Sequence, residues 1–314
     1  MDWWQGLWLL ARVVAAGFGL AVLGLVLVGA AHRVRRVVPD PVPPGKDGVQ
    51  YVGHGTALLR VDGVTFLTDP VLTKSISGVI RRFVSVGTTR DALRRVDAVL
   101  VSHWHADHFH PRSLKKLDRS VKCLVPRWPR TPLKVLERAG FVDVVEVAPG
   151  DVVGVAPRGA AGAKGVKVHV VPTNHGTAKG AVGYVVEGKT WTAYFPGDTA
   201  LDEQVMRGVG ERFRVDLALL PIGCYEGRLF GFVPVSFRSI HMGPADLPRA
   251  LEWVRPKRVV PVHWGVFRLG TEPARRSVEE LRRMLDAGEL PRERFAVLEP
   301  GQWADLQDLG LRED

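Results

Sequence analysis

Residues 98–108 read AVLVSHWHADH, an apolar run followed at once by a histidine-rich turn. The run Ala98–Ser102 predicts a buried β-strand. The turn contains four potential metal ligands, which are His103, His105, Asp107 and His108. Imidazole and carboxylate groups together suit zinc or a related divalent ion. A solvated histidine-rich loop would not account for such crowding, so we expect a metal site directly after this strand.

Three further candidate ligands also follow apolar runs. His175 ends the run Val166–Asn174, Asp198 follows Trp191–Gly197, and His263 follows Arg258–Val262. Alone, each has an ordinary explanation, because a histidine after a strand is often a surface residue and an aspartate after glycine often lies in a turn. Strand ends that converge on one sheet edge form the usual site of layered α/β proteins. We therefore expect these three residues to join the first four.

The apolar pattern predicts an α/β protein with two sheets and helices packed outside them. Short strands are expected at Gln50–Val52, Ala57–Val61, Val64–Thr68, Val121–Val125, Val166–Pro172, Trp191–Phe195, Leu217–Leu220 and Arg258–Val262. Helices are expected at Arg112–Leu117, Ala245–Val254 and Ser277–Leu285. The Gly- and Ala-rich stretch Val152–Lys167 is interpreted as a surface loop.

The N-terminus has the composition of a membrane anchor. Residues 13–31 carry no charge, and at about 1.5 Å per residue they nearly span a hydrocarbon core of about 30 Å. Tryptophans at positions 3, 4 and 8 precede the run, and arginines at positions 33, 35 and 36 follow it. This bias predicts a single-pass protein of the cell membrane with its catalytic domain in the cytoplasm. A cleaved signal peptide is the alternative, because Val28-Gly29-Ala30 resembles a cleavage site.

These features divide the chain into an anchor at 1–37, a Pro-rich spacer at 38–47 and a hydrolase domain at 48–314. A hydrophobic fraction of 46% excludes intrinsic disorder, and 2 cysteines exclude a disulfide scaffold. The net charge of +10 favours anionic partners such as lipid surfaces, phosphorylated substrates or nucleic acid. Lys and Arg are scattered without an aromatic-interleaved stripe, so no nucleic-acid partner is expected.

The motif H-x-H-x-D-H, followed by a single His, a Gly-Asp and a final His, resembles the metallo-β-lactamase superfamily. Several stretches resemble its N-acyl-phosphatidylethanolamine-hydrolysing phospholipase D family and the bacterial relatives of that family. They are Gly53-His54-Gly55-Thr56, Leu67-Thr68-Asp69-Pro70, Phe195-Pro196-Gly197-Asp198-Thr199, Pro221-Ile222-Gly223-Cys224-Tyr225-Glu226 and Val262-His263-Trp264-Gly265. The Gly-His opening is shared with ascorbate-lactonase-like members.

The resemblance implies an αββα sandwich with a dinuclear metal site. It implies that one ion is held by His103, His105 and His175, the second by Asp107, His108 and His263, with Asp198 bridging. The two divalent ions, zinc with iron or manganese as alternatives, would activate a shared hydroxide that Asp107 orients.

The resemblance also suggests roles for residues around the ligands. Asp69 resembles a structural aspartate that positions a ligand histidine. His54 and His241 resemble pocket histidines that bind substrate phosphate or aid the leaving group, and both are candidate catalytic residues with Asp107. Tyr225 and Glu226 are expected to line the pocket. No role is expected for three other histidines, which are His32, His110 and His169.

Two departures from the family concern the substrate entrance. Gly176 stands where the relatives carry a bulky residue, and the link after it, Thr177–Gly180, is short. Extra residues, several of them apolar, occupy Leu229–Ser239. Both changes leave the metal chemistry alone and bear on acyl-chain specificity.

The expected function is a phospholipase D-like phosphodiesterase on N-acyl-phosphatidylethanolamine or a related phospholipid. The apolar stretch Ile76–Val86, with Arg81 and Arg82, is expected at the lipid interface, and a plain surface helix is the alternative. Hydrolysis of a lactone or another small ester or phosphoester is the second possibility, and a nuclease is the third. A di-iron redox relative usually has Glu at the second motif histidine, so His105 argues against that class.

Overall fold

The structure is a computed structural model that describes residues 34–127, 131–159, 165–176, 178–229, 233–269 and 273–312. The expected membrane segment at 13–31 and His32 lie outside these ranges. Within the ranges, no helix has both the length and the apolar character needed to cross a bilayer.

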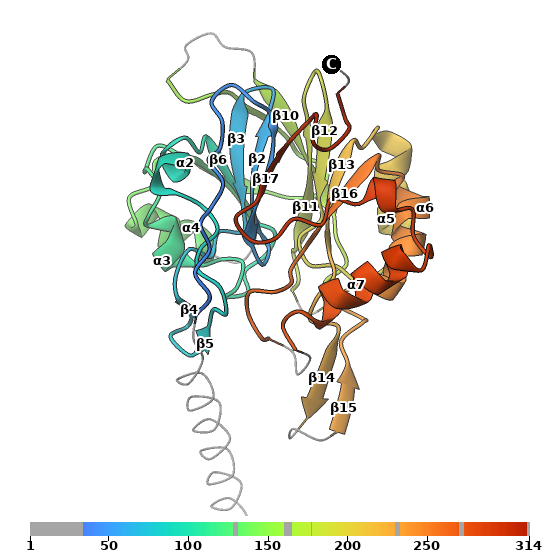
Figure 1. Ribbon diagram of the computed structural model, residues 1–314. Coiled ribbons are helices and arrows are strands. Elements are labelled where there is room, and N and C mark those ends of the chain that lie inside the picture. The colour runs from blue at the N-terminus through green and yellow to red at the C-terminus, as the bar shows by residue number, and fades with distance from the viewer. Residues whose placement is uncertain are drawn as a thin grey trace, which may run out of the picture.

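Two β-sheets face each other at the centre of the molecule (Figure 1). The seven-stranded sheet has the order β17 (Trp303–Asp305), β1 (Gly48–Gly53), β2 (Thr56–Val61), β3 (Val64–Thr68), β6 (Ala98–Leu100), β7 (Lys122–Pro126) and β8 (Val144–Val147). The six-stranded sheet has the order β16 (Arg258–Val262), β13 (Leu217–Pro221), β12 (Thr192–Phe195), β11 (Val182–Glu187), β10 (Val166–Pro172) and β9 (Val152–Val155). Strands β3, β6, β7 and β8 run parallel, as do β12, β13 and β16.

Helices cover the outer face of each sheet (Figure 1). The seven-stranded sheet is covered by α2 (Arg90–Arg94), α3 (Pro111–Leu114) and α4 (Thr131–Arg138). The six-stranded sheet is covered by α5 (Glu203–Arg212), α6 (Leu247–Val254) and α7 (Arg276–Asp286), with the short 3₁₀ turns η1 (Pro244–Asp246) and η2 (Arg292–Arg294). Side chains cap several helices, as when Asp202 accepts from the Val205 amide at the start of α5. The expected αββα sandwich is confirmed.

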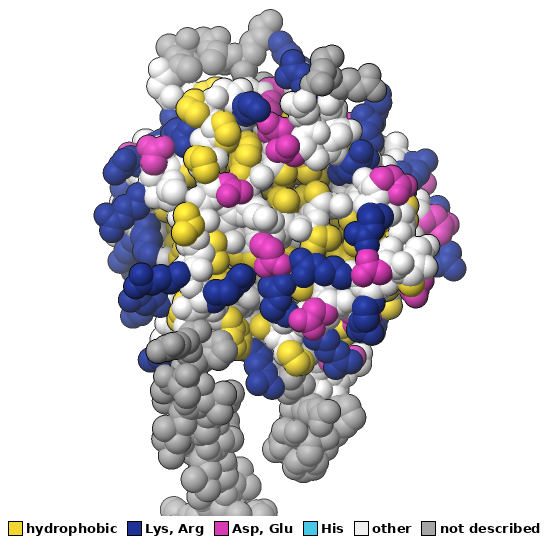
Figure 2. Space-filling view, viewed as in Figure 1, with side chains coloured by type: hydrophobic (Ala, Val, Ile, Leu, Met, Phe, Trp, Pro, Cys, Tyr) yellow, Lys and Arg dark blue, Asp and Glu magenta, His cyan; other side chains and the backbone are white. Residues whose placement is uncertain are grey.

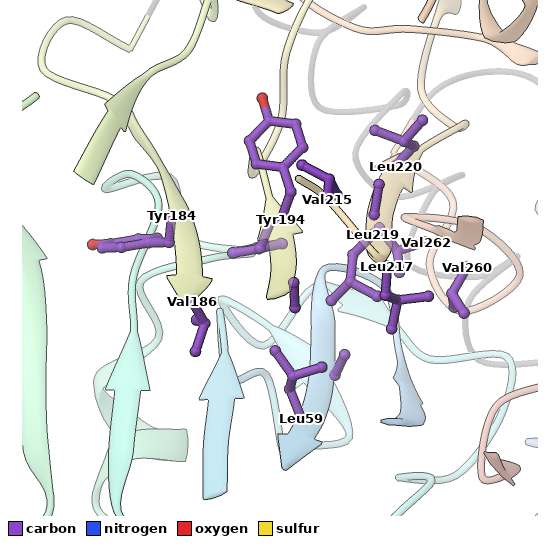
Figure 3. Close-up of a cluster of buried hydrophobic side chains, with 14 of the residues drawn as sticks. Leu59, Tyr184, Val186, Tyr194, Val215, Leu217, Leu219, Leu220, Val260 and Val262 are labelled. Atoms are coloured by element: carbon purple, nitrogen blue, oxygen red, sulfur yellow. The ribbon is translucent and has the colours of Figure 1, made fainter. Parts of the chain in front are cut away.

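The core lies between the two sheets. Figure 3 shows Leu59 of β2 facing side chains of the second sheet such as Val186 and Leu217. Every residue of β13 is buried, because one face meets the opposite sheet and the other meets the helices. Burying each Leu or Val side chain contributes roughly 1.5–3 kcal/mol to the stability of the fold. The packing on both faces of the sheet therefore holds in place the strands that carry the site.

The expected strands and helices are confirmed to within a few residues, with one correction. Val152–Lys167 is not simply a loop, because β9 occupies its first four residues and pairs with β10. Val152 and Gly154 are exposed while Val155 is buried, as in an edge strand with one face in solvent. Its glycine and alanine content concealed that alternation.

The stretch Ile76–Val86 forms a hairpin rather than a helix. Strands β4 (Ser75–Ile76) and β5 (Ile80–Arg81) pair antiparallel. Ile76 and Val84 are buried, whereas Val79 and Arg81 are exposed. Arg82 is only 2% exposed, so the expectation that it meets the lipid interface is wrong.

The proline-rich segment before β1 is fixed to the body of the domain. The Arg35 amide donates to the Phe83 carbonyl, and the Ser85 amide donates back to the Arg35 carbonyl. Further along, the Asp40 amide donates to the carbonyl of Gly301. The described chain therefore begins beside β5 and runs along the molecule to β1 (Figure 1).

The extra residues Leu229–Ser239 contribute a second hairpin, β14 (Glu226–Leu229) and β15 (Val233–Ser236). It lies at the same end of the molecule as β4 and β5, at the lower end of Figure 1.

Candidate metal centre

The candidate ligands follow the carboxyl ends of four strands, β6, β10, β12 and β16. The chain turns sharply at this edge, where four non-glycine residues have positive φ. These residues are His54 at 64°, Asp69 at 31°, Cys224 at 64° and His263 at 64°. Such conformations cost of order 1–3 kcal/mol each and persist only where surrounding structure holds them, as at functional sites.

The first cluster consists of His103, His105 and His175, whose ligand atoms all lie within 4.8 Å of one another. His175 Nε2 lies 3.2 Å from His105 Nδ1. The other nitrogen of His175, Nδ1, is 3.0 Å from the Ile240 carbonyl and donates to it. That bond leaves the Nε2 lone pair directed at the cluster.

The second cluster consists of His54, Asp107, His108 and His263, again with ligand atoms within 4.8 Å of one another. Asp107 Oδ2 lies 3.4 Å from His108 Nε2 and 3.9 Å from His263 Nε2. It also accepts a hydrogen bond of 3.0 Å from His54 Nε2. Asp107 is therefore the common neighbour of the three histidines.

Asp198 connects the two clusters. Its Oδ2 lies 3.0 Å from His108 Nε2 and 3.1 Å from His263 Nε2. It also forms a potential ligand group with His175 and His241. A carboxylate in contact with both sets of histidines is suited to bridge two cations.

The glycine that precedes Asp198 is required for a steric reason. Gly197 has φ of 67°, and a Cβ there would lie 2.3 Å from Ser102 Cβ. Because real Cβ atoms do not approach that closely, only glycine lets Asp198 follow β12 at this position.

Asp69 contacts His108, one of the candidate ligands, as expected. It is fully buried and accepts from the Ser102 amide at 2.7 Å and the Ser102 hydroxyl at 2.5 Å. His108 Nδ1 donates to it at 2.6 Å, which directs His108 Nε2 toward Asp198. A carboxylate behind a ligating histidine fixes both the tautomer and the ring orientation.

The carboxylates and histidines of the two clusters pair tightly and shift one another's pKa values. Burial favours a neutral ring, yet Asp198, Asp107 and Asp69 raise the pKa of His108 well above its ordinary value. Burial would raise the pKa of Asp198, but His108 and His263 hold it well below the usual range. The three carboxylates therefore favour the protonated form of His108.

Several buried ring nitrogens lack a hydrogen bond of good geometry. Among the described residues they include Nε2 of His103, His108 and His263. Buried polar atoms almost always have a partner, and these three belong to the candidate ligand clusters. A set of imidazole nitrogens and carboxylate oxygens fits zinc, iron or manganese.

His54 and His241 both reach this centre. The His54 ring centroid lies 3.9 Å from that of His263, and the His241 ring lies 5.1 Å from that of His175. Burial lowers the pKa of His54 to about 3 and the pKa of His241 to about 4. Both rings are neutral at pH 7 and act as hydrogen-bonding groups rather than as cations.

Tyr225 and Glu226, expected at the pocket, contact α7 through their polar groups. The Tyr225 hydroxyl donates to Glu280 at 2.6 Å, and Glu226 pairs with Arg276 at 3.0 Å. Carboxylate and arginine partners on the neighbouring helix therefore hold these two polar groups, and their place at the pocket stays a prediction.

The other histidines of the described chain lie outside the clusters. His110 caps α3, and His169 pairs with Glu187. Two groups at the site were not anticipated, the Ser102 hydroxyl and the Ile240 carbonyl. Ser102 precedes the motif and could have been suspected, whereas a backbone carbonyl leaves no signal in the sequence.

Comparison with known proteins defines the class. A family profile described as the β-lactamase superfamily domain matches residues 65–264. The chain belongs to the metallo-β-lactamase superfamily, and it is a metal-dependent hydrolase of that superfamily.

Particular relatives cover most of the chain. It is 27% identical over 284 residues to an N-acyl-phosphatidylethanolamine-hydrolyzing phospholipase D of Caenorhabditis elegans, covering 82% of this chain and 75% of that protein. It is 30% identical over 267 residues to a metal-dependent hydrolase of Hyperthermus butylicus, covering 81% and 97% respectively. The solved structure of a possible metal-dependent hydrolase from Veillonella parvula matches with a TM-score of 0.66 at 20% identity, covering 83% of this chain and 100% of that one.

Proposed function

We propose that this protein is a dinuclear phosphodiesterase of the phospholipase D type that hydrolyses N-acyl-phosphatidylethanolamine or a related phospholipid. The observation that carries the proposal is the pair of ligand clusters joined through Asp198. The likeness to the Caenorhabditis elegans phospholipase D supports the substrate class.

In this proposal His103, His105 and His175 hold one cation, and Asp107, His108 and His263 hold the other, with Asp198 shared. Zinc is the proposed ion, and iron or manganese suit the same donors. When bound, two such ions lower the pKa of a shared water and stabilise the negative charge that develops on the phosphoryl oxygens.

The surrounding residues orient and exchange protons. Asp107 accepts a hydrogen bond from His54 Nε2, which fixes its carboxylate in the second cluster, where it would orient the water. His241 Nδ1 is buried without a hydrogen bond, 3.5 Å from Asp198 Oδ2. Because this ring is neutral, it serves as a hydrogen-bonding partner for a phosphoryl or leaving oxygen.

We further propose that residues 13–31 form a single membrane span with the catalytic domain on the cytoplasmic side. The uncharged run and the arginines that follow it support this arrangement. A membrane anchor would keep the enzyme at its lipid substrate.

A second candidate function is hydrolysis of a lactone or another small ester. The Gly53-His54-Gly55-Thr56 opening, which lies at the site and is shared with lactonase-like proteins, favours it.

The test is a mass-spectrometric product assay on a phospholipid extract that contains N-acylated phosphatidylethanolamines. Zinc-loaded protein is compared with Asp107→Asn and with the matched control Asp91→Asn, whose carboxylate is exposed at the start of α2. We expect phosphatidic acid and N-acylethanolamine from the unmutated protein and the control alone. Intact lipids with a fully metal-loaded protein would contradict the phospholipase proposal and direct the search to lactones.

A further inference from the structure

We infer that the end of the sandwich that carries the metal centre is a docking face for an anionic lipid bilayer. The docking face consists of Val34, Arg35, Arg36, Val79, Arg81 and Trp104. This inference rests on the proposed function and adds to it which surface meets the membrane and which residues make the contact.

The face and the site share one end of the molecule. Hairpin β4–β5 follows the carboxyl end of β3, and Trp104 lies within the ligand motif after β6. The described chain begins at the same end, because Arg35 bridges to Val84 just after β5. Figure 1 shows this end below, with the C-terminus at the opposite end.

The distance from the proposed anchor is short. The uncharged run ends at residue 31, three residues before Val34. An extended chain covers at most about 3.6 Å per residue, so the end of the span would lie within roughly 10 Å of Val34. Arg35 is hydrogen-bonded to the domain through both its amide and its carbonyl. A span that ends at residue 31 would therefore hold this end of the domain against the membrane.

Exposed apolar side chains gather on this face. Among the described residues six large apolar side chains are exposed, and three of them are Val34 at 45%, Val79 at 51% and Trp104 at 42%. Single exposed valines are ordinary, but a tryptophan and two valines around a hydrolase site suit the boundary between head groups and acyl chains.

The charge of the face complements an anionic bilayer. Residues 70–90 contain four basic residues and no acidic one. Of these, Lys74 and Arg81 are exposed on or next to the β4–β5 hairpin, and the Arg35 side chain, which pairs with Glu299 at 3.4 Å, is 56% exposed. Figure 2 shows many dark-blue side chains, with yellow and a few magenta side chains among them, in the lower half of the same view. Clusters of Lys and Arg next to a span are attracted to anionic head groups.

The buried Arg82 holds the hairpin in position. Its Nη1 donates to the Val71 carbonyl at 2.6 Å and its Nε to the Val84 carbonyl at 3.1 Å. Its guanidinium also lies 5.0 Å from the centroid of the Phe267 ring. Ile76 packs inward beside these groups, so Val79 and Arg81 are presented outward on a fixed support.

The test measures which surface touches lipid, without requiring turnover. The full chain, with Cys224→Ser and either Val79→Cys or Val142→Cys, is labelled with a fluorophore. Both are reconstituted in vesicles of equal parts phosphatidylcholine and phosphatidylglycerol that contain nitroxide-labelled lipid. Val142 is the matched control, because it is 81% exposed and precedes β8 at the opposite end of the parallel strands. Cys123 is fully buried and is not labelled.

We expect the nitroxide to quench the label at 79 several-fold more than the label at 142, and Arg81→Glu to reduce that difference. Equal quenching at both positions, or a chain that does not float with the vesicles, would overturn the inference. Strong quenching at 79, combined with intact N-acyl-phosphatidylethanolamine in the product assay described above, would support the docking face and contradict the phospholipase proposal. Hydrolysis in that assay together with equal quenching at 79 and 142 would support the phospholipase proposal and overturn the docking face.

Discussion

At the scale of single residues, the site depends on groups that fix the ligands as much as on the ligands. Asp69 accepts three hydrogen bonds, two from Ser102 and one from His108. Ser102 in turn contacts His103 Nδ1 at 2.9 Å. One buried carboxylate therefore orients residues of both clusters.

Asp69→Asn removes that negative charge while keeping the shape of the side chain. We expect zinc affinity to fall about 10–100-fold, the usual effect of losing a group that orients a ligand histidine. Competition with a chromogenic chelator measures the change. Asp118→Asn is the control, because its carboxylate is 57% exposed on the surface, and an equal effect in both variants would refute the role of Asp69.

Gly197→Ala tests the close approach behind Asp198. The new Cβ would fall 2.3 Å from Ser102 Cβ at a φ of 67°, so we expect a loss of at least about 2 kcal/mol in the free energy of unfolding. Gly208→Ala in α5 has open space, and it should be neutral or stabilising by up to about 1 kcal/mol. Urea unfolding of both variants distinguishes them. Similar stability in the two would contradict the steric argument.

At the scale of elements, short pieces of structure are held by individual buried groups. The hairpin β4–β5 has only two residues in each strand, so pairing alone cannot fix it. Arg82 connects it to Val71, Val84 and Phe267. Sequence alone could not show which of Arg81 and Arg82 is buried. In strands of two residues, the alternation of inward and outward side chains is too short to recognise in the sequence.

Arg82→Met and Arg81→Met form a matched pair. The first leaves two carbonyls without their donors in the interior, and we expect it to lower the free energy of unfolding by about 2 kcal/mol. The second changes an exposed side chain and should alter stability by less than about 0.5 kcal/mol. Chemical denaturation measures both, and equal effects would refute the supporting role of Arg82.

At the scale of the whole molecule, Glu299 ties α7 to the segment that precedes β17. It accepts from Arg275 at 2.7 and 2.9 Å and from Arg282 at 2.9 Å. Hydrogen bonds from Arg275 are the main cause that lowers the pKa of Glu299 to about 2. A lowered carboxyl pKa stabilises the fold above the ordinary value of 4.5, and that contribution is lost as the pH falls toward 2.

Glu299→Gln should therefore lower stability at pH 7 by on the order of 1 kcal/mol, since the partly exposed pair is screened by solvent. The difference between variant and parent should shrink as the pH falls through 4.5 toward 2, where the parent carboxyl takes up its proton. Thermal unfolding across this range is the measurement. A difference that does not change with pH would contradict the ionic contribution.

Much of the architecture was predictable because the ligands follow strands. The apolar runs before His103, His175, Asp198 and His263 predicted that all four follow converging strand ends, and the structure has β6 of one sheet and β10, β12 and β16 of the other ending at the same site. The edge strand β9 was missed because its exposed face reads as a loop. The contact of Tyr225 with Glu280 was not predicted, because the two residues lie 55 apart in the sequence and no local pattern reports such a contact.

The central claim is a dinuclear centre joined through Asp198, and calorimetric titration of the metal-free full chain with zinc tests it most directly. We predict two ions bound per chain, as a shared bridging carboxylate requires. We also predict that protons are released, because the carboxylates hold protons on His108 and His263 until a cation binds. Asp198→Asn should weaken both binding events. A single ion per chain, bound with an affinity that Asp198→Asn leaves unchanged, would contradict the account.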